Sequence, residues 1–180
     1  MPVFAEQDYG PEQVALRYKE YTRSGSSAGF VKAYHDILVA GASAYGTIFR
    51  HLAAAKPSPC LVHCTAGKDR TGVLVALLFL LAGAPADEIA KEYSLTDLGL
   101  AKLKPLFTER LMKNPAIGGN AEGVQNMISS KEENMRDTIT MIENDFGGPE
   151  DYMRQYCRMS DEEIGRMRRN LRDGALIEMR

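Results

Sequence analysis

Cys64 and Arg70 are separated by five residues, and Thr71 and Gly72 follow directly. A thiol becomes a strong nucleophile as a thiolate, and a nearby guanidinium together with oriented backbone N–H groups favours that charged form. A planar guanidinium also binds two oxygens of a tetrahedral oxyanion at once. The spacing therefore predicts phosphoryl transfer to sulfur, with Cys64 as the nucleophile and Arg70 binding the phosphate oxygens.

The sequence on either side of this loop predicts the elements that position it. Cys60 to His63 form a short apolar run that predicts a buried strand, and Val73 to Ala82 form an apolar run of helix length. A loop between a strand and a helix N-terminus directs several backbone N–H groups at one point, where the helix dipole adds partial positive charge. This arrangement is typical of a phosphate-binding site.

The sequence around Cys64 resembles a known signature. The residues HCTAGKDRTG, from His63 to Gly72, are similar to the loop of the protein tyrosine phosphatase superfamily, in which HC is followed by five residues and RTG. Within this loop, the residues AGKD resemble those of a branch of bacterial and fungal phosphatases related to a secreted mycobacterial tyrosine phosphatase. Similarity extends over most of the chain, through PVFAEQDYGPE, GFVKAYHDIL, EIAKEYSLTDLGL, MISSKEENM, FGGPEDYM and RMSDEEIGRMRRNL.

The resemblance implies a cysteine-dependent phosphatase that needs no metal or other cofactor and hydrolyses phosphate monoesters through a cysteinyl-phosphate. Its substrates would be phosphorylated proteins or phosphoinositides. Thr71 is expected to assist the departing sulfur, and His63 and Gly72 to support the shape of the loop. The implied phosphate-binding residues are Cys64, Thr65, Ala66, Gly67, Lys68, Asp69 and Arg70.

Two questions stay open inside this interpretation. The general acid that protonates the leaving alcohol is either Asp69, which the resemblance favours slightly, or Asp8, which precedes a predicted helix start at Gly10-Pro11. The ammonium group of Lys68 either faces the pocket, where it would favour substrates with extra negative charge, or faces solvent. The alternative from a different functional class is a binding protein, a catalytically weak relative of the phosphatases that uses the same loop to bind phosphoproteins or phosphoinositides.

Composition limits the class of protein. The 180 residues are 44% hydrophobic and 26% charged, which is ordinary for one globular domain spanning residues 1–180. The formal net charge of −2 gives no indication of a nucleic-acid surface. The apolar run from Val73 to Ala82 is too short to span a bilayer, so stable membrane insertion is not expected. The sequence predicts no oligomeric state.

The three cysteines do not suggest a disulfide scaffold. Cys60 and Cys64 would lie about 13 Å apart across an extended strand, which is too far for a bridge. An odd count with one reactive thiol fits a reducing, cytoplasmic location. Cys60 is interpreted as a buried strand residue, with a redox partner of Cys64 as the alternative.

The expected fold class is α/β. A small, mainly parallel sheet with the Cys60 to His63 strand at its centre would be flanked by many helices. Family members carry strands ahead of the Pro2-Val3-Phe4 segment, so the resemblance implies that this N-terminal part is missing and the sheet reduced. Helical spacing from Phe30 to Leu52 predicts a half-buried helix or helix pair, and Ala121 to Ser130 is interpreted as a surface loop, or alternatively as a lid.

Overall fold

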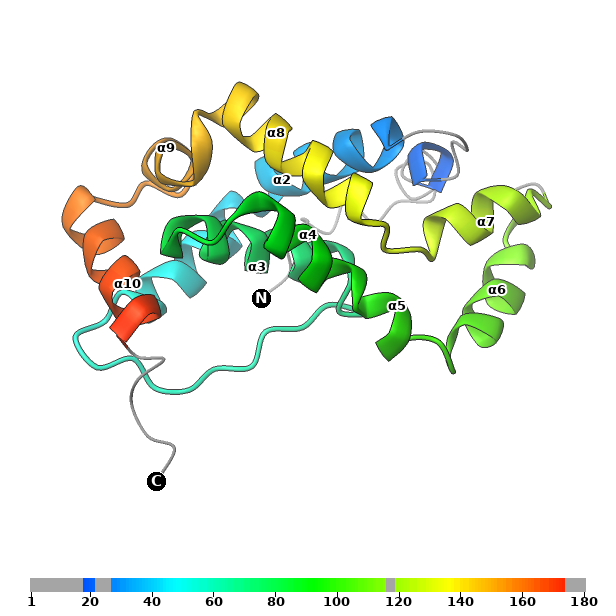
Figure 1. The fold of residues 1–180 in the computed structure, drawn as a ribbon, viewed down its shortest axis with the longest axis horizontal. Helices are drawn as coiled ribbons and strands as arrows, with labels where there is room; N and C mark the ends of the chain where they lie inside the picture. The colour runs from blue at the N-terminus through cyan, green and yellow to red at the C-terminus, as the bar shows by residue number, and fades with distance from the viewer. Residues whose placement is uncertain (1–17, 22–26, 116–118, 174–180) are drawn as a thin grey trace.

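The computed structural model describes residues 18–21, 27–115 and 119–173, and α-helices dominate them (Figure 1). Residues 18–21 form one short helical turn. In chain order the α-helices that follow are α2 (Ala28–Leu52), α3 (Asp69–Ala82), α4 (Ala86–Ser94), α5 (Thr96–Gly99), α6 (Lys104–Met112), α7 (Ala121–Met127), α8 (Glu132–Phe146), α9 (Gly148–Gln155) and α10 (Asp161–Asp173).

The predicted parallel sheet is wrong for the described residues, none of which lies in a β-strand. Residues 57–64, which contain the predicted central strand, run along the lower edge of the molecule in Figure 1 without a pairing partner. Leu61 is 88% exposed and Cys60 is exposed, so the expected buried position of Cys60 is also wrong. An apolar run becomes a buried strand when a second extended segment supplies its hydrogen bonds, and the described residues contain no such segment.

The core is formed where α2 packs against α3 and α8. Helix α2 continues unbroken through Gly41 and Gly46, so the region predicted as a helix or helix pair is a single helix. A Cβ at Gly46 would approach the Cys157 carbonyl oxygen to 3.1 Å, which indicates that the glycine permits close packing here. The buried face of α2 follows the predicted helical spacing and includes Phe30, Tyr34, Ile37, Leu38, Tyr45 and Phe49.

Helix α3 is the central apolar helix, as its sequence predicts. Its buried side chains are Val73, Leu74, Ala76, Leu77 and Leu81. None of the helices within the described ranges is long and apolar enough to cross a membrane.

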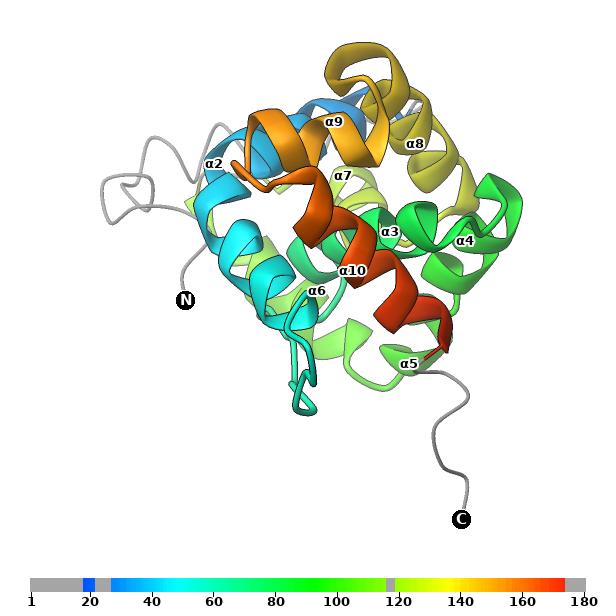
Figure 2. The same ribbon diagram turned by 90° about the vertical axis from the view of Figure 1, so that its left-hand side faces the viewer.

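Helix α10 crosses α2 and α3 (Figure 2) and fixes the C-terminal end of α3. Arg172 Nε donates to the carbonyl of Ala82 at 2.8 Å, and Arg168 Nε donates to the carbonyl of Leu81 at 3.3 Å. Gly83 ends the helix with a φ of 89°. Cationic donors at a helix C-terminus satisfy its last carbonyls and interact favourably with the helix dipole.

The segment predicted as a surface loop from Ala121 to Ser130 is also corrected by the structure. It contains α7, which begins where the Asn120 side chain accepts a hydrogen bond from the Gly123 N–H at 2.9 Å. Val124 is fully buried. The polar composition of this segment did not predict a helix, because only one side of the short segment is buried.

Replacing Leu77 by Ala tests the role of α3 in the core. Leu77 is fully buried, so its truncation should lower the free energy of unfolding by about 3 kcal/mol. The matched change Leu98→Ala, at a side chain that is 76% exposed, should cost less than about 0.5 kcal/mol. Urea denaturation followed by circular dichroism measures both, and equal losses would contradict the packing described here.

Candidate active site

Cys64 lies where the extended segment turns into the first turn of α3. Helix α3 begins at Asp69, and its first backbone hydrogen bond runs from the Gly72 N–H to the Lys68 carbonyl at 3.0 Å. The Lys68 side chain does not cap this helix end. The N–H groups of the first turn are therefore available to an anion held by the loop of residues 64–70, called the Cys64 loop below.

The pKa of the Cys64 thiol is lowered from its ordinary value. Burial is the largest single influence and raises the pKa, but hydrogen bonds to sulfur outweigh it. They come from the Thr71 hydroxyl and from the backbone N–H groups of Thr71 and Ala66. Negative charge on Asp69 acts in the opposite direction and raises the pKa. The net result favours a thiolate, which is the nucleophilic form of cysteine.

The Thr71 hydroxyl lies close enough to Cys64 to lower the pKa of its thiol. Its oxygen is buried and makes no hydrogen bond of ordinary geometry, to Cys64 or to any other residue, in the part of the chain that the structure describes. A buried hydroxyl without another partner gains most by donating to the thiolate beside it. This contact is the one expected of a residue that assists sulfur as a leaving group.

Two glycines of the signature are required for different reasons. Gly67 has a φ of 68°, in the left-handed region that other residues rarely adopt, although no atom would block a Cβ there. At Gly72, a Cβ would lie 3.1 Å from the ring of Tyr93. Gly67 therefore shapes the turn, while Gly72 lets α4 pack closely against the start of α3.

Arg70 is anchored from two sides. Its Nη2 donates to the Thr65 hydroxyl at 3.1 Å, and its carbonyl accepts a hydrogen bond from the Tyr45 hydroxyl of α2 at 2.7 Å. The guanidinium is thus bound to the same loop that carries Cys64. Such an arrangement orients a fork of N–H donors for the oxygens of a phosphate.

Lys68 and Asp69 have a geometry that the sequence did not predict. Lys68 is only 4% exposed, and its Nζ lies 2.6 Å from Asp69 Oδ1. The ammonium group thus faces neither solvent nor an open pocket, and both predicted orientations differ from the observed one. Tyr34 donates a second hydrogen bond to the same Oδ1 at 2.8 Å, and no described residue binds Oδ2.

The remaining predicted residues have less defined surroundings. His63 is exposed, with Nδ1 3.3 Å from the Cys64 carbonyl oxygen, a contact close enough to influence the loop backbone. Asp8 lies outside the described residues. The exposed Cys60 makes no disulfide.

Sequence reasoning missed the contribution of three tyrosines. Tyr34, Tyr45 and Tyr93 are buried and direct their hydroxyls toward the Cys64 loop or the start of α3. Tyr34 and Tyr45 had been assigned only to the apolar face of a helix. Tyrosine at a buried helical position is itself a signal, because its hydroxyl requires a hydrogen-bond partner that phenylalanine would not.

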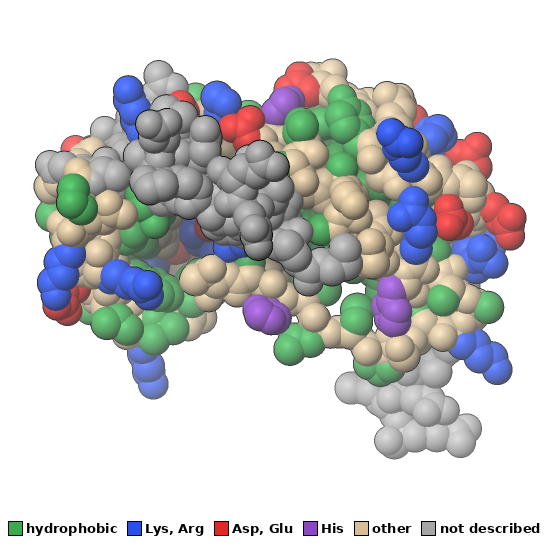
Figure 3. Space-filling model, turned by 180° about the vertical axis from the view of Figure 1, so that it is seen from behind, with side chains coloured by type: hydrophobic (Ala, Val, Ile, Leu, Met, Phe, Trp, Pro, Cys, Tyr) green, Lys and Arg blue, Asp and Glu red, His purple; other side chains and the backbone are tan. Residues whose placement is uncertain are grey.

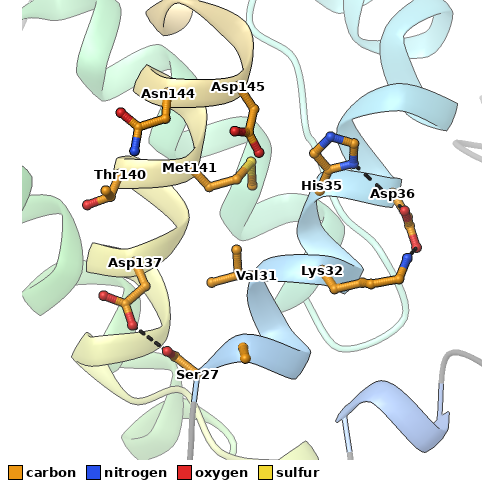
Figure 4. A pocket seen from close by; sticks show the side chains of 11 residues that line it. Ser27, Val31, Lys32, His35, Asp36, Asp137, Thr140, Met141, Asn144 and Asp145 are labelled. Atoms are coloured by element: carbon orange, nitrogen blue, oxygen red, sulfur yellow. Dashed lines mark hydrogen bonds and ion pairs between the residues drawn. The ribbon is translucent and has the colours of Figure 1, made fainter.

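A groove lies elsewhere, between α2 and α8 (Figure 4), and has a volume of about 690 Å³. None of the predicted site residues lines it. Its polar side chains are partly paired with one another, Asp137 with Ser27 and Asp36 with Lys32. The groove therefore gives no alternative centre of chemistry.

No metal centre is found within the described ranges. They contain no group of three or more histidine, cysteine, aspartate or glutamate side chains that could hold a metal ion. Histidine side chains appear at separate places on the face seen in Figure 3 and do not gather in one cluster.

Comparison with known proteins shows a family to which the chain is similar. Residues 2–173 match the model of the tyrosine phosphatase family. A tyrosine-protein phosphatase of Nostoc commune is 38% identical over 87 residues, which are 48% of this chain and 29% of that protein. The triple specificity protein phosphatase PtpB of Mycobacterium tuberculosis is 29% identical over 110 residues, which are 60% of this chain and 35% of that protein.

The chain belongs to the tyrosine phosphatase family, since the family match covers nearly all of it. This confirms the resemblance found from the signature around Cys64. The chain spans only about a third of the length of the two curated relatives, by the matched segments.

Replacing Thr71 by Val tests the hydrogen bond to sulfur. Valine keeps the shape and removes the hydroxyl, so the pKa of Cys64 should rise by about one unit. Because iodoacetamide reacts with the thiolate, the midpoint of alkylation against pH should move upward by the same amount. Thr47→Val on the exposed face of α2 is the matched control. An unchanged midpoint in the Thr71 variant would show that its hydroxyl does not bind the sulfur.

Proposed function

We propose that this chain is a phosphatase that hydrolyses phosphate monoesters of phosphorylated proteins or phosphoinositides by attack of Cys64 on phosphorus. The observation that carries the proposal is the position of Cys64 beside the first turn of α3, where Thr71 of that turn and the Ala66 N–H of the loop lower the pKa of its thiol. The family membership supports the same reaction class.

In the first step, the Cys64 thiolate forms a bond to phosphorus while the bond between phosphorus and the ester oxygen breaks. The general acid transfers a proton to that oxygen, and the alcohol leaves. Arg70 and the loop N–H groups bind the phosphate oxygens as negative charge develops on them.

In the second step, water attacks phosphorus and gives a proton to the general acid, which the first step left as a carboxylate, and the bond between phosphorus and sulfur breaks. Inorganic phosphate is released, and Thr71 stabilises the departing thiolate with its hydroxyl. Every atom of this cycle comes from the ester, water and side chains of this chain.

Asp69 is the general acid that we propose among the described residues. Both of its contacts fall on Oδ1, so Oδ2 remains available for proton transfer, and the side chain is 28% exposed. Asp8 remains the alternative.

The chemistry also indicates where the protein works. The described cysteines Cys60, Cys64 and Cys157 are all free. Burial raises the pKa of Cys157 to about 11, so this thiol is unreactive, whereas Cys64 requires reducing conditions to stay active. We therefore propose a reducing compartment, namely the cytoplasm.

A second candidate function is phosphate binding with little turnover. The segment of residues 57–64 favours it, because no strand among the described residues lies beside it to support Cys64. Measurable turnover of p-nitrophenyl phosphate by the purified chain would exclude this candidate. Binding of a phosphotyrosine peptide without turnover would support it.

Replacing Cys64 by Ser tests the nucleophile. The less acidic hydroxyl should reduce release of phosphate from p-nitrophenyl phosphate by about 10³-fold or more. Cys60→Ser is the matched control, since it makes the same change at an exposed cysteine four positions earlier, and it should retain full activity. Undiminished turnover by the Cys64 variant would overturn the mechanism.

Replacing Asp69 or Asp8 by Asn distinguishes the two candidate acids. Loss of the acid should remove the basic limb of the pH profile, because activity no longer depends on a proton that is lost as pH rises. The decrease in turnover should be larger for phenyl phosphate than for p-nitrophenyl phosphate, whose leaving group needs less protonation.

We expect both effects for Asp69→Asn. Asp36→Asn, on the exposed side of α2, is the control and should change neither limb. If the basic limb disappears only in the Asp8 variant, Asp8 is the acid and Asp69 has another role.

A further inference from the structure

Lys68 and Asp69 of the Cys64 loop form a polar cluster with Tyr34 and Tyr93, in which Asp69 is half-buried and the other three side chains are buried. Asp69 Oδ1 accepts from Lys68 Nζ at 2.6 Å and from the Tyr34 hydroxyl at 2.8 Å. The hydroxyls of Tyr34 and Tyr93 are 2.6 Å apart. These side chains come from α2, α4 and the start of α3, so the cluster connects three helices at the loop.

The ammonium group of Lys68 is enclosed by aromatic rings. Its Nζ lies 4.8 Å from the ring centroid of Phe30 and 5.7 Å from that of Tyr21. Burial alone would lower the pKa of Lys68, but Asp69 and Tyr93 raise it above its ordinary value. A buried cation is tolerated when it is paired, and here its partner is Asp69.

Asp69 is also close enough to Cys64 to affect it. Its negative charge is one of the influences that raise the pKa of the Cys64 thiol. A second anion near a thiolate is unfavourable unless a cation compensates it. Lys68 Nζ contacts Asp69 Oδ1, and its positive charge compensates the negative charge of this carboxylate.

Other titratable and charged side chains lie around this cluster and also influence its electrostatics. Asp97 of α5 interacts electrostatically with both Lys68 and Tyr93, and it is itself paired with Lys104 at 3.0 Å. The Tyr45 hydroxyl donates to the Arg70 carbonyl, and Tyr45 interacts electrostatically with both Cys64 and Arg70. Of the cations in this set, only Lys68 is in contact with the Asp69 carboxylate in the described part of the chain.

We propose that Lys68, Tyr34 and Tyr93 are positioning residues that hold Asp69 and compensate its charge whenever it is ionised, so that this charge does not destabilise the Cys64 thiolate. Lys68 is then committed to the protein interior and does not recognise additional phosphates of a substrate. The inference rests on the proposed role of Cys64 as nucleophile. The experiment below measures the reactivity of the Cys64 thiol, which can be determined whether or not the chain turns over a substrate.

The experiment is a double-mutant cycle of Lys68→Met and Asp69→Asn. In each variant the rate of iodoacetamide addition to Cys64 is followed against pH by mass spectrometry of the Cys64 peptide. Lys68→Met should move the midpoint upward by about one pH unit, which means about tenfold slower alkylation below the midpoint. Asp69→Asn should move it downward.

The double variant decides between mechanisms. If Lys68 acts by compensating Asp69, Lys68→Met should have little effect once Asp69 is Asn, so the double variant should resemble Asp69→Asn alone. An equal upward shift in both backgrounds would overturn the proposal, because Lys68 would then act on the thiolate directly. An unchanged midpoint in Lys68→Met would overturn it as well.

Tyr34→Phe keeps the test valid if the Lys68 variant does not fold. Removing this hydroxyl deprives Asp69 of one donor and should move the alkylation midpoint upward by a smaller amount. The matched control is Tyr152→Phe, which also removes a buried hydroxyl, here one that donates to the Leu38 carbonyl at 2.7 Å. A shift no larger than in this control would contradict the role of Tyr34.

Substrate kinetics distinguish a positioning role of Lys68 from recognition of substrate charge. As a positioning residue, Lys68 should affect kcat equally for p-nitrophenyl phosphate and for a soluble inositol phosphate carrying several phosphate groups. If Lys68→Met instead raises KM for the inositol phosphate alone, with the thiol midpoint unmoved, Lys68 recognises substrate charge and the proposal is wrong.

Discussion

The stabilisation of the Cys64 thiolate by Thr71, in the first turn of α3, and by the Ala66 N–H of the loop is the interaction on which the rest of the site depends. Burial alone would raise the pKa of this thiol and leave it unreactive, as it does for Cys157. Donors from Thr71 and Ala66 reverse that effect at Cys64. The half-buried Cys64 and the buried Cys157 therefore differ in their donors: Thr71 and Ala66 together provide three N–H and O–H groups to Cys64, whereas Tyr152 provides one O–H group to Cys157.

Because the donors belong to α3, the position of this helix determines the geometry of the site. Arginines of α10 bind the carbonyls at its C-terminal end, and the Tyr45 hydroxyl of α2 binds the Arg70 carbonyl at its N-terminal end. Between these ends, buried apolar side chains such as Leu74 and Leu77 fix it against the core. A helix anchored at both ends keeps its first turn aligned with Cys64, although no sheet lies beside it among residues 18–21, 27–115 and 119–173.

The sequence predicted the local part of this site well. The spacing of Cys64 and Arg70 and the apolar run after Gly72 were enough to predict a loop followed by a buried helix, because loop and helix start are adjacent in the chain. The sheet could not be predicted correctly, since an apolar run such as Cys60 to His63 does not specify whether a partner strand is present. Strand formation depends on pairing, which local sequence does not contain.

Lys68 shows the same limit at the level of one side chain. Its place in the loop followed from the sequence, but its direction depends on Phe30, Tyr34 and Tyr93, which are distant in the chain. A lysine beside an aspartate in an exposed loop would remain hydrated, and the pair would contribute little. Enclosure by these helices removes water from the pair, so the charges of Lys68 and Asp69 must balance each other. That requirement links the packing of α2 and α4 to the charge beside the nucleophile.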